Sequence, residues 1–142
     1  MSHGGIPVVA HLGWRPQQAR YAGVRTAVVA GRTQDQIDEM VQTAWQMTRC
    51  GAVMLLIEQC TAEAAEAIVR EVSIPVIGCG AGPACHGQVV VLHDLLGMTD
   101  EHPSFVTPLA GMGGEIESIA RKWRELVESG RYPKGHPYQM TE

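Results

Sequence analysis

A glutamate and a histidine stand at the ends of two apolar segments, where they could carry out acid–base chemistry. Glu58 follows the apolar run at residues 52–57, AVMLLI, and precedes a helix start at Thr61. His11 stands in the equivalent place after the apolar run at residues 6–10. A carboxylate at the end of a buried strand can accept a proton from a substrate. A histidine there can donate a hydrogen bond to an oxyanion or a carboxylate.

Both residues also have structural interpretations, which position by itself leaves open. The carboxylate of Glu58 could cap the following helix or pair with an arginine. His11 could be a partly buried histidine that backbone groups hold in place. We therefore treat both as candidate catalytic residues whose roles depend on what lies near them.

A glycine-rich loop follows the apolar segment at residues 74–77. Its glycines Gly78, Gly80 and Gly82 leave backbone amides uncovered at the carboxyl end of a strand, where α/β folds bind ligands. Such amides can line a site for an anion or a carboxylate. The pattern G-C-G-A-G lacks the spacing of a dinucleotide-binding loop, and a tight turn is the alternative explanation. Trp14, three residues after His11, could also touch a ligand.

The four cysteines form no C-x-x-C pair. Cys60, Cys79 and Cys85 could be imagined with His86 and His93 as a soft-metal site, but their spacing matches no standard zinc pattern. Scattered thiols in a reducing cytosol are the favoured interpretation, and we expect a cytoplasmic protein.

Composition limits the kinds of partner that the chain can have. Hydrophobic residues make up 45% of the 142 residues and charged residues 18%, which indicates a globular chain. The net charge of −4, without a basic cluster, argues against nucleic acid and anionic membranes as partners. No apolar stretch approaches the length needed to span a bilayer, and no signal peptide is recognisable.

The elements that must position the candidate residues alternate between strands and helices. Strands are expected at residues 6–10, 52–57, 74–77 and 88–92, helices at 33–50, 61–72 and about 114–129, and an irregular loop at 13–32. This alternation predicts an α/β fold with a parallel sheet in a single domain over residues 1–142. Periodicity leaves open whether the four strands form a small flavodoxin-like layer or half of an eight-stranded barrel.

Several segments together resemble one enzyme family, ketopantoate hydroxymethyltransferase. Residues 5–17, GIPVVAHLGWRPQ, are similar to the family segment G-I-P-V-x-x-H-L-G-L-x-P-Q. Residues 31–33, GRT, and 55–58, LLIE, resemble its G-R-T and L-V-L-E. Residues 74–82, IPVIGCGAG, resemble its I-P-V-I-G-I-G-A-G, and SGRYP at 129–133 is matched as well. These motifs occur in the family's order and extend over nearly the whole chain.

The resemblance implies a fold and a reaction. The family folds as a (β/α)8 barrel and transfers a hydroxymethyl group from 5,10-methylenetetrahydrofolate to the α-carbon of a 2-oxo acid, with a magnesium ion polarising the oxo acid. Glu58 matches the glutamate that removes the α-proton, and His11 matches a histidine of the active site. Gly78, Gly80, Gly82 and Trp14 would then contact substrate.

The departures from the family pattern imply a partner. The matched segments belong to the C-terminal half of the family barrel, and no residue of this chain matches the family's metal-binding aspartates. We therefore expect this half-barrel to be completed by a separate chain that resembles the N-terminal half and supplies the magnesium ligands, in a higher oligomer. Cys79 replaces an aliphatic residue, which indicates an altered substrate pocket. The alternative is a non-catalytic homo-oligomeric paralogue with a ligand-binding or regulatory role.

Overall fold

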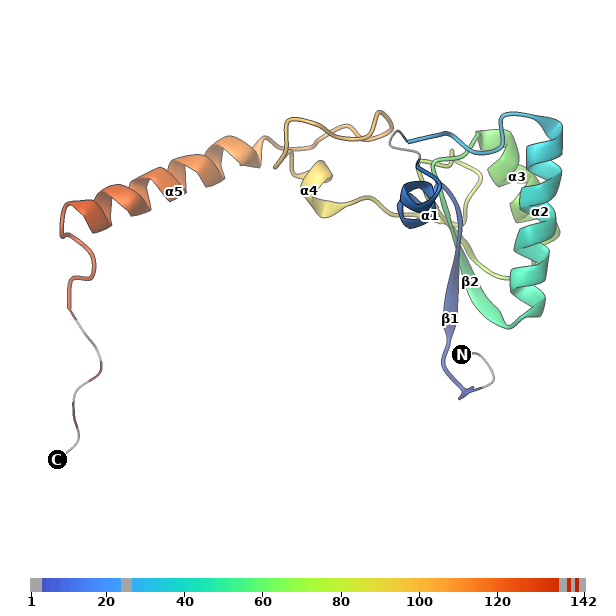
Figure 1. The fold of residues 1–142 in the computed structure, drawn as a ribbon, viewed down its shortest axis with the longest axis horizontal. Helices are drawn as coiled ribbons and strands as arrows, with labels where there is room; N and C mark the ends of the chain where they lie inside the picture. Colours follow the sequence, from blue (N-terminus) through green and yellow to red (C-terminus); the bar gives the residue numbers. More distant parts are fainter. Residues whose placement is uncertain (1–3, 24–26, 136–137, 139, 141–142) are drawn as a thin grey trace. The chain divides into compact units, whose positions relative to one another are not determined.

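Four parallel strands form one sheet in the N-terminal part of the chain (Figure 1). The computed structural model describes residues 4–23, 27–135, 138 and 140. The chain divides into two compact units, Met1–Val90 and Val91–Glu142. The single domain predicted over residues 1–142 stays a prediction.

Within its described residues, the first unit holds the sheet and three helices. The strands follow one another in the order β1 (Val8–Gly13), β2 (Ala52–Glu58), β3 (Val76–Cys79) and β4 (Gly87–Gln88), each parallel to the next. The helices are α1 (Pro16–Tyr21), α2 (Gln34–Arg49) and α3 (Ala62–Glu71). The predicted α/β class with a parallel sheet is confirmed.

Threonine side chains cap the starts of α2 and α3. The Oγ1 of Thr33 accepts a hydrogen bond from the amide of Gln36, whose Oε1 accepts one from the amide of Arg32 at 2.9 Å. This pair satisfies the amide of Gln36, which has no intrahelical partner in the first turn of α2, and the amide of Arg32 just before the helix. Thr61 caps α3 in the same way by accepting from the amide of Ala64.

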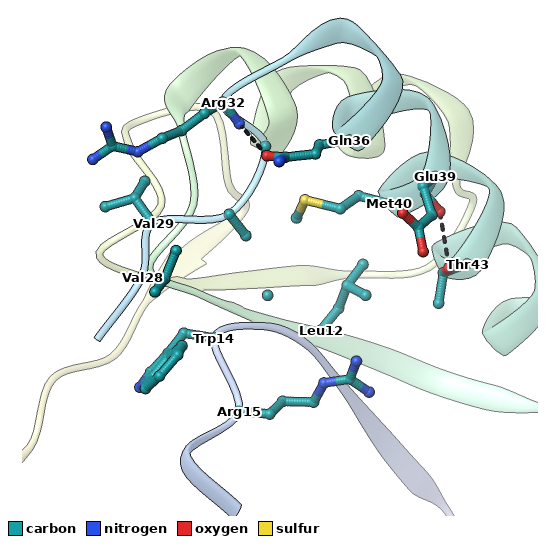
Figure 2. Close-up of a pocket in the computed structure, with 13 residues that line it drawn as sticks. Leu12, Trp14, Arg15, Val28, Val29, Arg32, Gln36, Glu39, Met40 and Thr43 are labelled. Carbon is teal, nitrogen blue, oxygen red and sulfur yellow. Dashed lines mark hydrogen bonds between the residues drawn. The ribbon is translucent and has the colours of Figure 1, made fainter. Parts of the chain in front are cut away.

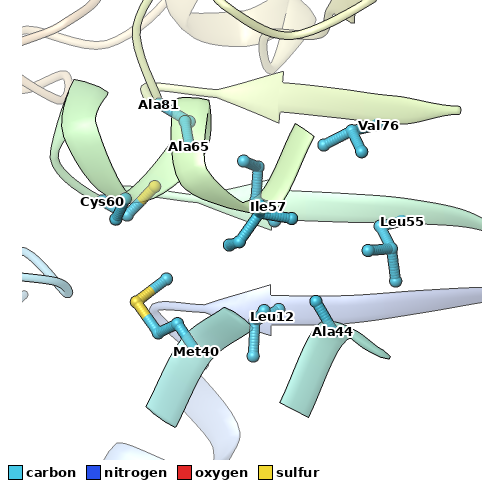
Figure 3. Packing of buried hydrophobic residues seen from close by; sticks show 11 residues of the cluster. Leu12, Met40, Ala44, Leu55, Ile57, Cys60, Ala65, Val76 and Ala81 are labelled. Atoms are coloured by element: carbon cyan, nitrogen blue, oxygen red, sulfur yellow. The ribbon is translucent and has the colours of Figure 1, made fainter. Parts of the chain in front are cut away.

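Both helices pack on one face of the sheet and enclose the core (Figures 1 and 3). The buried cluster consists of Leu12, Met40, Ala44, Leu55, Ile57, Cys60, Ala64, Ala65, Ile68, Val76 and Ala81. Side chains of a strand alternate between its two faces, so Leu55 and Ile57 of β2 point to the helices. Leu55 and Ile57 are fully buried there, so the residues that alternate with them along β2 point to the opposite face of the sheet.

The opposite face of the sheet, which we call the open face, carries the alternate residues. The register pairs His11 with Leu56, Leu56 with Ile77, and Glu58 with Cys79. Paired residues of neighbouring strands point to the same side, so these five side chains share the open face with Val9. The side chain of Val9 is 54% exposed there.

The second unit contains α4 (Leu92–Leu95) and α5 (Met112–Glu128). The amide of Leu109 donates to the carbonyl of Leu95 at 2.8 Å, and the amide of Met112 donates to that of Leu96. These bonds tie the start of α5 to the end of α4. None of the helices in the described part of the chain is long and apolar enough to cross a membrane.

Two predicted elements are wrong. The strand expected at residues 88–92 is limited to the two residues of β4, after which the amide of Val89 donates to the carbonyl of Gly78 and the chain turns into α4. A strand forms only where a neighbour accepts its backbone bonds, which apolar composition does not show. The irregular loop at 13–32 contains α1, whose Pro16 occupies the first helical position that proline favours.

Candidate active site

The ends of β1 and β2 lie in close contact, and a glycine makes that contact possible. The amide of Trp14 donates to the carbonyl of Glu58 at 2.8 Å. Gly13, the register partner of Glu58, has a φ of +91°, and a Cβ on it would lie 2.2 Å from the carbonyl oxygen of Glu58. Both the conformation and the space therefore require glycine at this position.

The chain turns sharply directly after Glu58. Gln59 adopts a φ of +47°, the left-handed region that residues other than glycine rarely enter. Its amide donates to the carbonyl of Cys79 at 2.8 Å, and its own carbonyl accepts from the amide of Ala30 at 3.0 Å. These two bonds hold a conformation that costs about 1–2 kcal/mol in an L-residue, and such strain is often found next to functional residues.

The structure brings the two candidate catalytic residues together. Nε2 of His11 lies 3.0 Å from Oε2 of Glu58, although the side chains come from different strands. The ring is not aligned for a hydrogen bond, and Nε2 is buried without a hydrogen-bond partner in the described structure. The two groups are therefore in contact at the distance of an ion pair but not in hydrogen-bond geometry.

The pair is accessible to a small molecule. The side chains of His11 and Glu58 are 31% and 26% exposed, and both point to the open face at the carboxyl ends of their strands. A carboxylate there can accept a proton, and a small rotation of the imidazole would let Nε2–H orient that carboxylate. This arrangement suits proton abstraction from a substrate bound on the open face.

The three glycines of the predicted substrate loop occupy different environments. Gly78 lies in β3 on the helix side, where a Cβ would meet Sγ of Cys85 at 2.8 Å. Gly80 and Gly82 follow with φ of +65° and +79°, and the carbonyl of Gly82 accepts from Nε2 of Gln88 at 2.9 Å. These contacts describe the packing of the loop, and the predicted role of the three glycines in substrate binding stays a prediction.

Trp14 lies on the side of the sheet that carries α2. There it lines a pocket of about 360 Å³ together with Leu12, Arg15 and residues of α2 (Figure 2). Its predicted contact with substrate also stays a prediction.

The thiols and histidines considered as a metal site have structural surroundings of their own. Burial, and then the nearby Cys85, raises the pKa of Cys60 to about 11, so this thiol stays protonated at neutral pH. Nδ1 of His86 accepts a hydrogen bond from the amide of Val76 at 3.1 Å. Across the described residues, no group of three or more His, Cys, Asp or Glu side chains could hold a metal ion.

Two residues were missed as contributors from the sequence. Gln59 supplies the strained turn after Glu58, and Arg15 has a buried Nε without a partner in the described structure. Both depend on tertiary contacts. Cys79, which the family pattern marked as a change in the substrate pocket, is the register partner of Glu58 on the open face.

Comparison with known proteins agrees with the motifs. The profile of a family described as ketopantoate hydroxymethyltransferase matches residues 1–135. Similar relatives are the 3-methyl-2-oxobutanoate hydroxymethyltransferases of Thermococcus kodakarensis, 38% identical over 140 residues, and Pyrococcus abyssi, 36% identical over 135. That of Syntrophobacter fumaroxidans is 35% identical over 145 residues. The alignments cover 97%, 94% and 100% of this chain but 48%, 47% and 50% of the relatives. The chain thus spans about half the length of the curated relatives it matches.

Proposed function

Because this chain belongs to the ketopantoate hydroxymethyltransferase family, we propose that it forms one half of a barrel enzyme that transfers a hydroxymethyl group to a 2-oxo acid, with Glu58 as the general base. The observation that carries this proposal is the contact of 3.0 Å between Nε2 of His11 and Oε2 of Glu58 on the open face. It joins the two residues that the family resemblance assigns to the active site. Proton abstraction next to a carbonyl needs a positioned carboxylate of this kind.

The proposed chemistry begins with the proton on the carbon next to the keto group. An oxygen of Glu58 takes that proton, the electrons of the C–H bond form the enolate double bond, and the negative charge moves to the keto oxygen. The enolate carbon then forms a bond to the methylene carbon of 5,10-methylenetetrahydrofolate, and a water oxygen forms the new bond that gives the hydroxyl group. Both carbon–nitrogen bonds of that methylene carbon break. The two nitrogens take up one proton from the water and the proton that Glu58 removed, and tetrahydrofolate leaves. His11 positions the carboxylate of Glu58 before the proton moves and stabilises it by its proximity.

The substrate that the relatives' names print is 3-methyl-2-oxobutanoate, and we propose a substrate of the same chemical class. Cys79 lies beside Glu58 in the register, so it is placed to contact the alkyl part of the oxo acid. A thiol where the family has a bulkier aliphatic side chain favours an oxo acid with a different alkyl group.

The described residues do not by themselves fit the magnesium ion of the family. His11 and Glu58 form a pair, and no third metal-binding side chain of the described chain joins them. We therefore leave the metal ligands to the complementary half of the barrel. When bound, the ion would polarise the keto oxygen and so acidify the adjacent C–H bond.

The open face supports the need for a complementary half. Parallel sheets are almost always covered on both faces, and here α2 and α3 cover one of them. The open face holds Val9, Leu56 and Ile77, and none of the three is buried. A second half-barrel would bury these side chains in a barrel interior and would enclose Glu58. We propose that a separate chain supplies it.

Reconstitution with a defined second half tests the proposed function. The probe is the half of the Thermococcus kodakarensis relative that this chain does not match, co-expressed with the chain and supplied with magnesium, 3-methyl-2-oxobutanoate and 5,10-methylenetetrahydrofolate. Glu58→Gln should abolish product formation while assembly persists, because the amide cannot accept the proton. Glu71→Gln, an exposed change on α3, is the matched control and should leave turnover unchanged.

Two results would contradict the proposal. Equal turnover by the wild-type protein and Glu58→Gln would remove Glu58 as the base. The chain could instead fail to bind the second half, form a homo-oligomer and give no product. That result would support the alternative, a non-catalytic homo-oligomer that binds a ligand or regulates another protein.

A further inference from the structure

A groove of about 360 Å³ lies beside the edge strand of the sheet, on the side that carries the helices (Figure 2). One wall is the end of β1 at residues 12–15, the roof is the segment at residues 28–32, and the other wall is α2. The side chains that α2 contributes are Gln36, Glu39, Met40 and Thr43, which fall on one flank of the helix. No residue of α3, β2 or β3 lines it, so this flank of α2 faces the free edge of β1.

The position of the groove follows from how the other helices cover the sheet. The chain leaves β1, passes through α2 and returns into β2, then passes through α3 and returns into β3. In such right-handed units each helix lies over the seam between its two strands. A further parallel strand at the free edge of β1 would place its own helix over that seam, beside α2. The groove occupies that place.

We propose that this groove seats a helix of the complementary half-barrel and that an acidic side chain of that helix pairs with Arg15. The inference rests on the proposed function, since it requires the same partner. It adds a second contact surface, on the outer layer of the barrel, to the interior face that carries Glu58.

The state of Arg15 is the main evidence for the chemistry of the occupant. Its Nε is buried and has no hydrogen-bond partner in the described structure. Buried polar groups in native proteins are nearly always paired, so such a group indicates a missing acceptor. A carboxylate is the acceptor whose geometry and charge suit a guanidinium group best.

The remaining walls combine apolar packing with polar and charged side chains, among them Arg32 and Glu39. Leu12 and Met40 are buried apolar side chains at the base of the groove. The Oε1 of Gln36 already accepts from the amide of Arg32, and the hydroxyl of Thr43 donates to the carbonyl of Glu39 at 2.8 Å. An amphipathic helix with apolar side chains around one carboxylate would match this surface. A small anion is the competing occupant, because the volume lies at the lower end of ligand pockets.

The test measures assembly with the same half of the Thermococcus kodakarensis relative by analytical ultracentrifugation. Arg15→Glu should raise the dissociation constant of the assembly at least tenfold, because it places a second carboxylate against the acidic side chain of the partner helix. Arg20→Glu, an exposed charge reversal on α1, which begins directly after Arg15, is the matched control. A second pair guards against misfolding: Thr43→Trp fills the groove and should also weaken assembly, whereas Gln42→Trp, exposed on the same helix, should not. Circular dichroism checks that each variant folds.

The outcomes separate this inference from the proposed function. Normal assembly of both Arg15→Glu and Thr43→Trp would overturn the groove as a helix seat and leave the proposed function intact. Failure of the wild-type chain to assemble would contradict the proposed function. It would also contradict this inference, because the helix proposed for the groove belongs to the same partner. A homodimer of the unmixed chain that Arg15→Glu dissociates would assign the groove to a second copy. A rise in Tm with inorganic phosphate that Arg15→Glu removes would make the groove a small-anion site. Each of the last two results would overturn the inference.

Discussion

Replacing Gly13 with alanine should damage the fold at the candidate active site. The new Cβ would lie 2.2 Å from the carbonyl oxygen of Glu58, whereas carbon and oxygen atoms normally approach no closer than about 3.3 Å. The ends of β1 and β2 must therefore separate by roughly an ångström. That movement breaks the hydrogen bond from the amide of Trp14 to the carbonyl of Glu58.

The magnitude follows from three contributions. The φ of +91° costs an alanine about 1–2 kcal/mol, and loss of a partly buried backbone bond costs about 1–3 kcal/mol. Alanine also restricts the unfolded chain, which offsets about 0.4–1 kcal/mol. The free energy of unfolding should fall by roughly 2–4 kcal/mol in total.

A matched glycine isolates the contribution of the clash. Gly5 has a φ of +74°, but a Cβ on it meets nothing within 4 Å. Gly5→Ala should therefore lose only about 1 kcal/mol or less in urea unfolding followed by circular dichroism. If Gly13→Ala and Gly5→Ala lose the same free energy, the close approach of β1 to Glu58 does not exist in solution.

Three further changes test other parts of the structure. Thr61→Ala removes a hydroxyl that caps α3 and donates to the carbonyl of Gly31 at 2.7 Å, and should cost about 1–2 kcal/mol in urea unfolding; a loss near zero would contradict the cap. Burial raises the pKa of Cys60 from 9.0 to about 11. The unfolded thiol therefore ionises first, so the free energy of unfolding should fall from about pH 9 to about pH 11, and Cys60→Ala should flatten that dependence. Gly114→Ala meets nothing within 4 Å and should stabilise α5 by about 0.5–1 kcal/mol, more than Gly113→Ala, whose Cβ would lie 3.1 Å from the carbonyl of Met98.

Local signals made part of the fold predictable. The helix expected at residues 33–50 is α2, because its capping pair, Thr33 and Gln36, lies within four residues of the chain. The apolar run before Glu58 is β2, in which Leu55 and Ile57 are fully buried. The family that the motifs indicated is confirmed over residues 1–135.

Long-range pairing accounts for what the sequence did not predict. The run at 88–92 has the composition of a strand, yet β4 ends at Gln88 because pairing depends on a neighbour and not on hydropathy. The proximity of His11 to Glu58 depends on the register of two strands more than 40 residues apart. The position of the groove at Arg15 depends on which flank of α2 remains uncovered at the sheet edge.

The central claim, that Glu58 is a general base, is tested most directly by proton exchange without the folate. The chain, assembled with the second half and magnesium, would be incubated with 3-methyl-2-oxobutanoate in D₂O, and loss of the proton next to the keto group would be followed by NMR. The account predicts exchange by the wild-type assembly and by Glu71→Gln, and exchange at the buffer rate by Glu58→Gln. Exchange by Glu58→Gln at the wild-type rate would show that another group removes the proton.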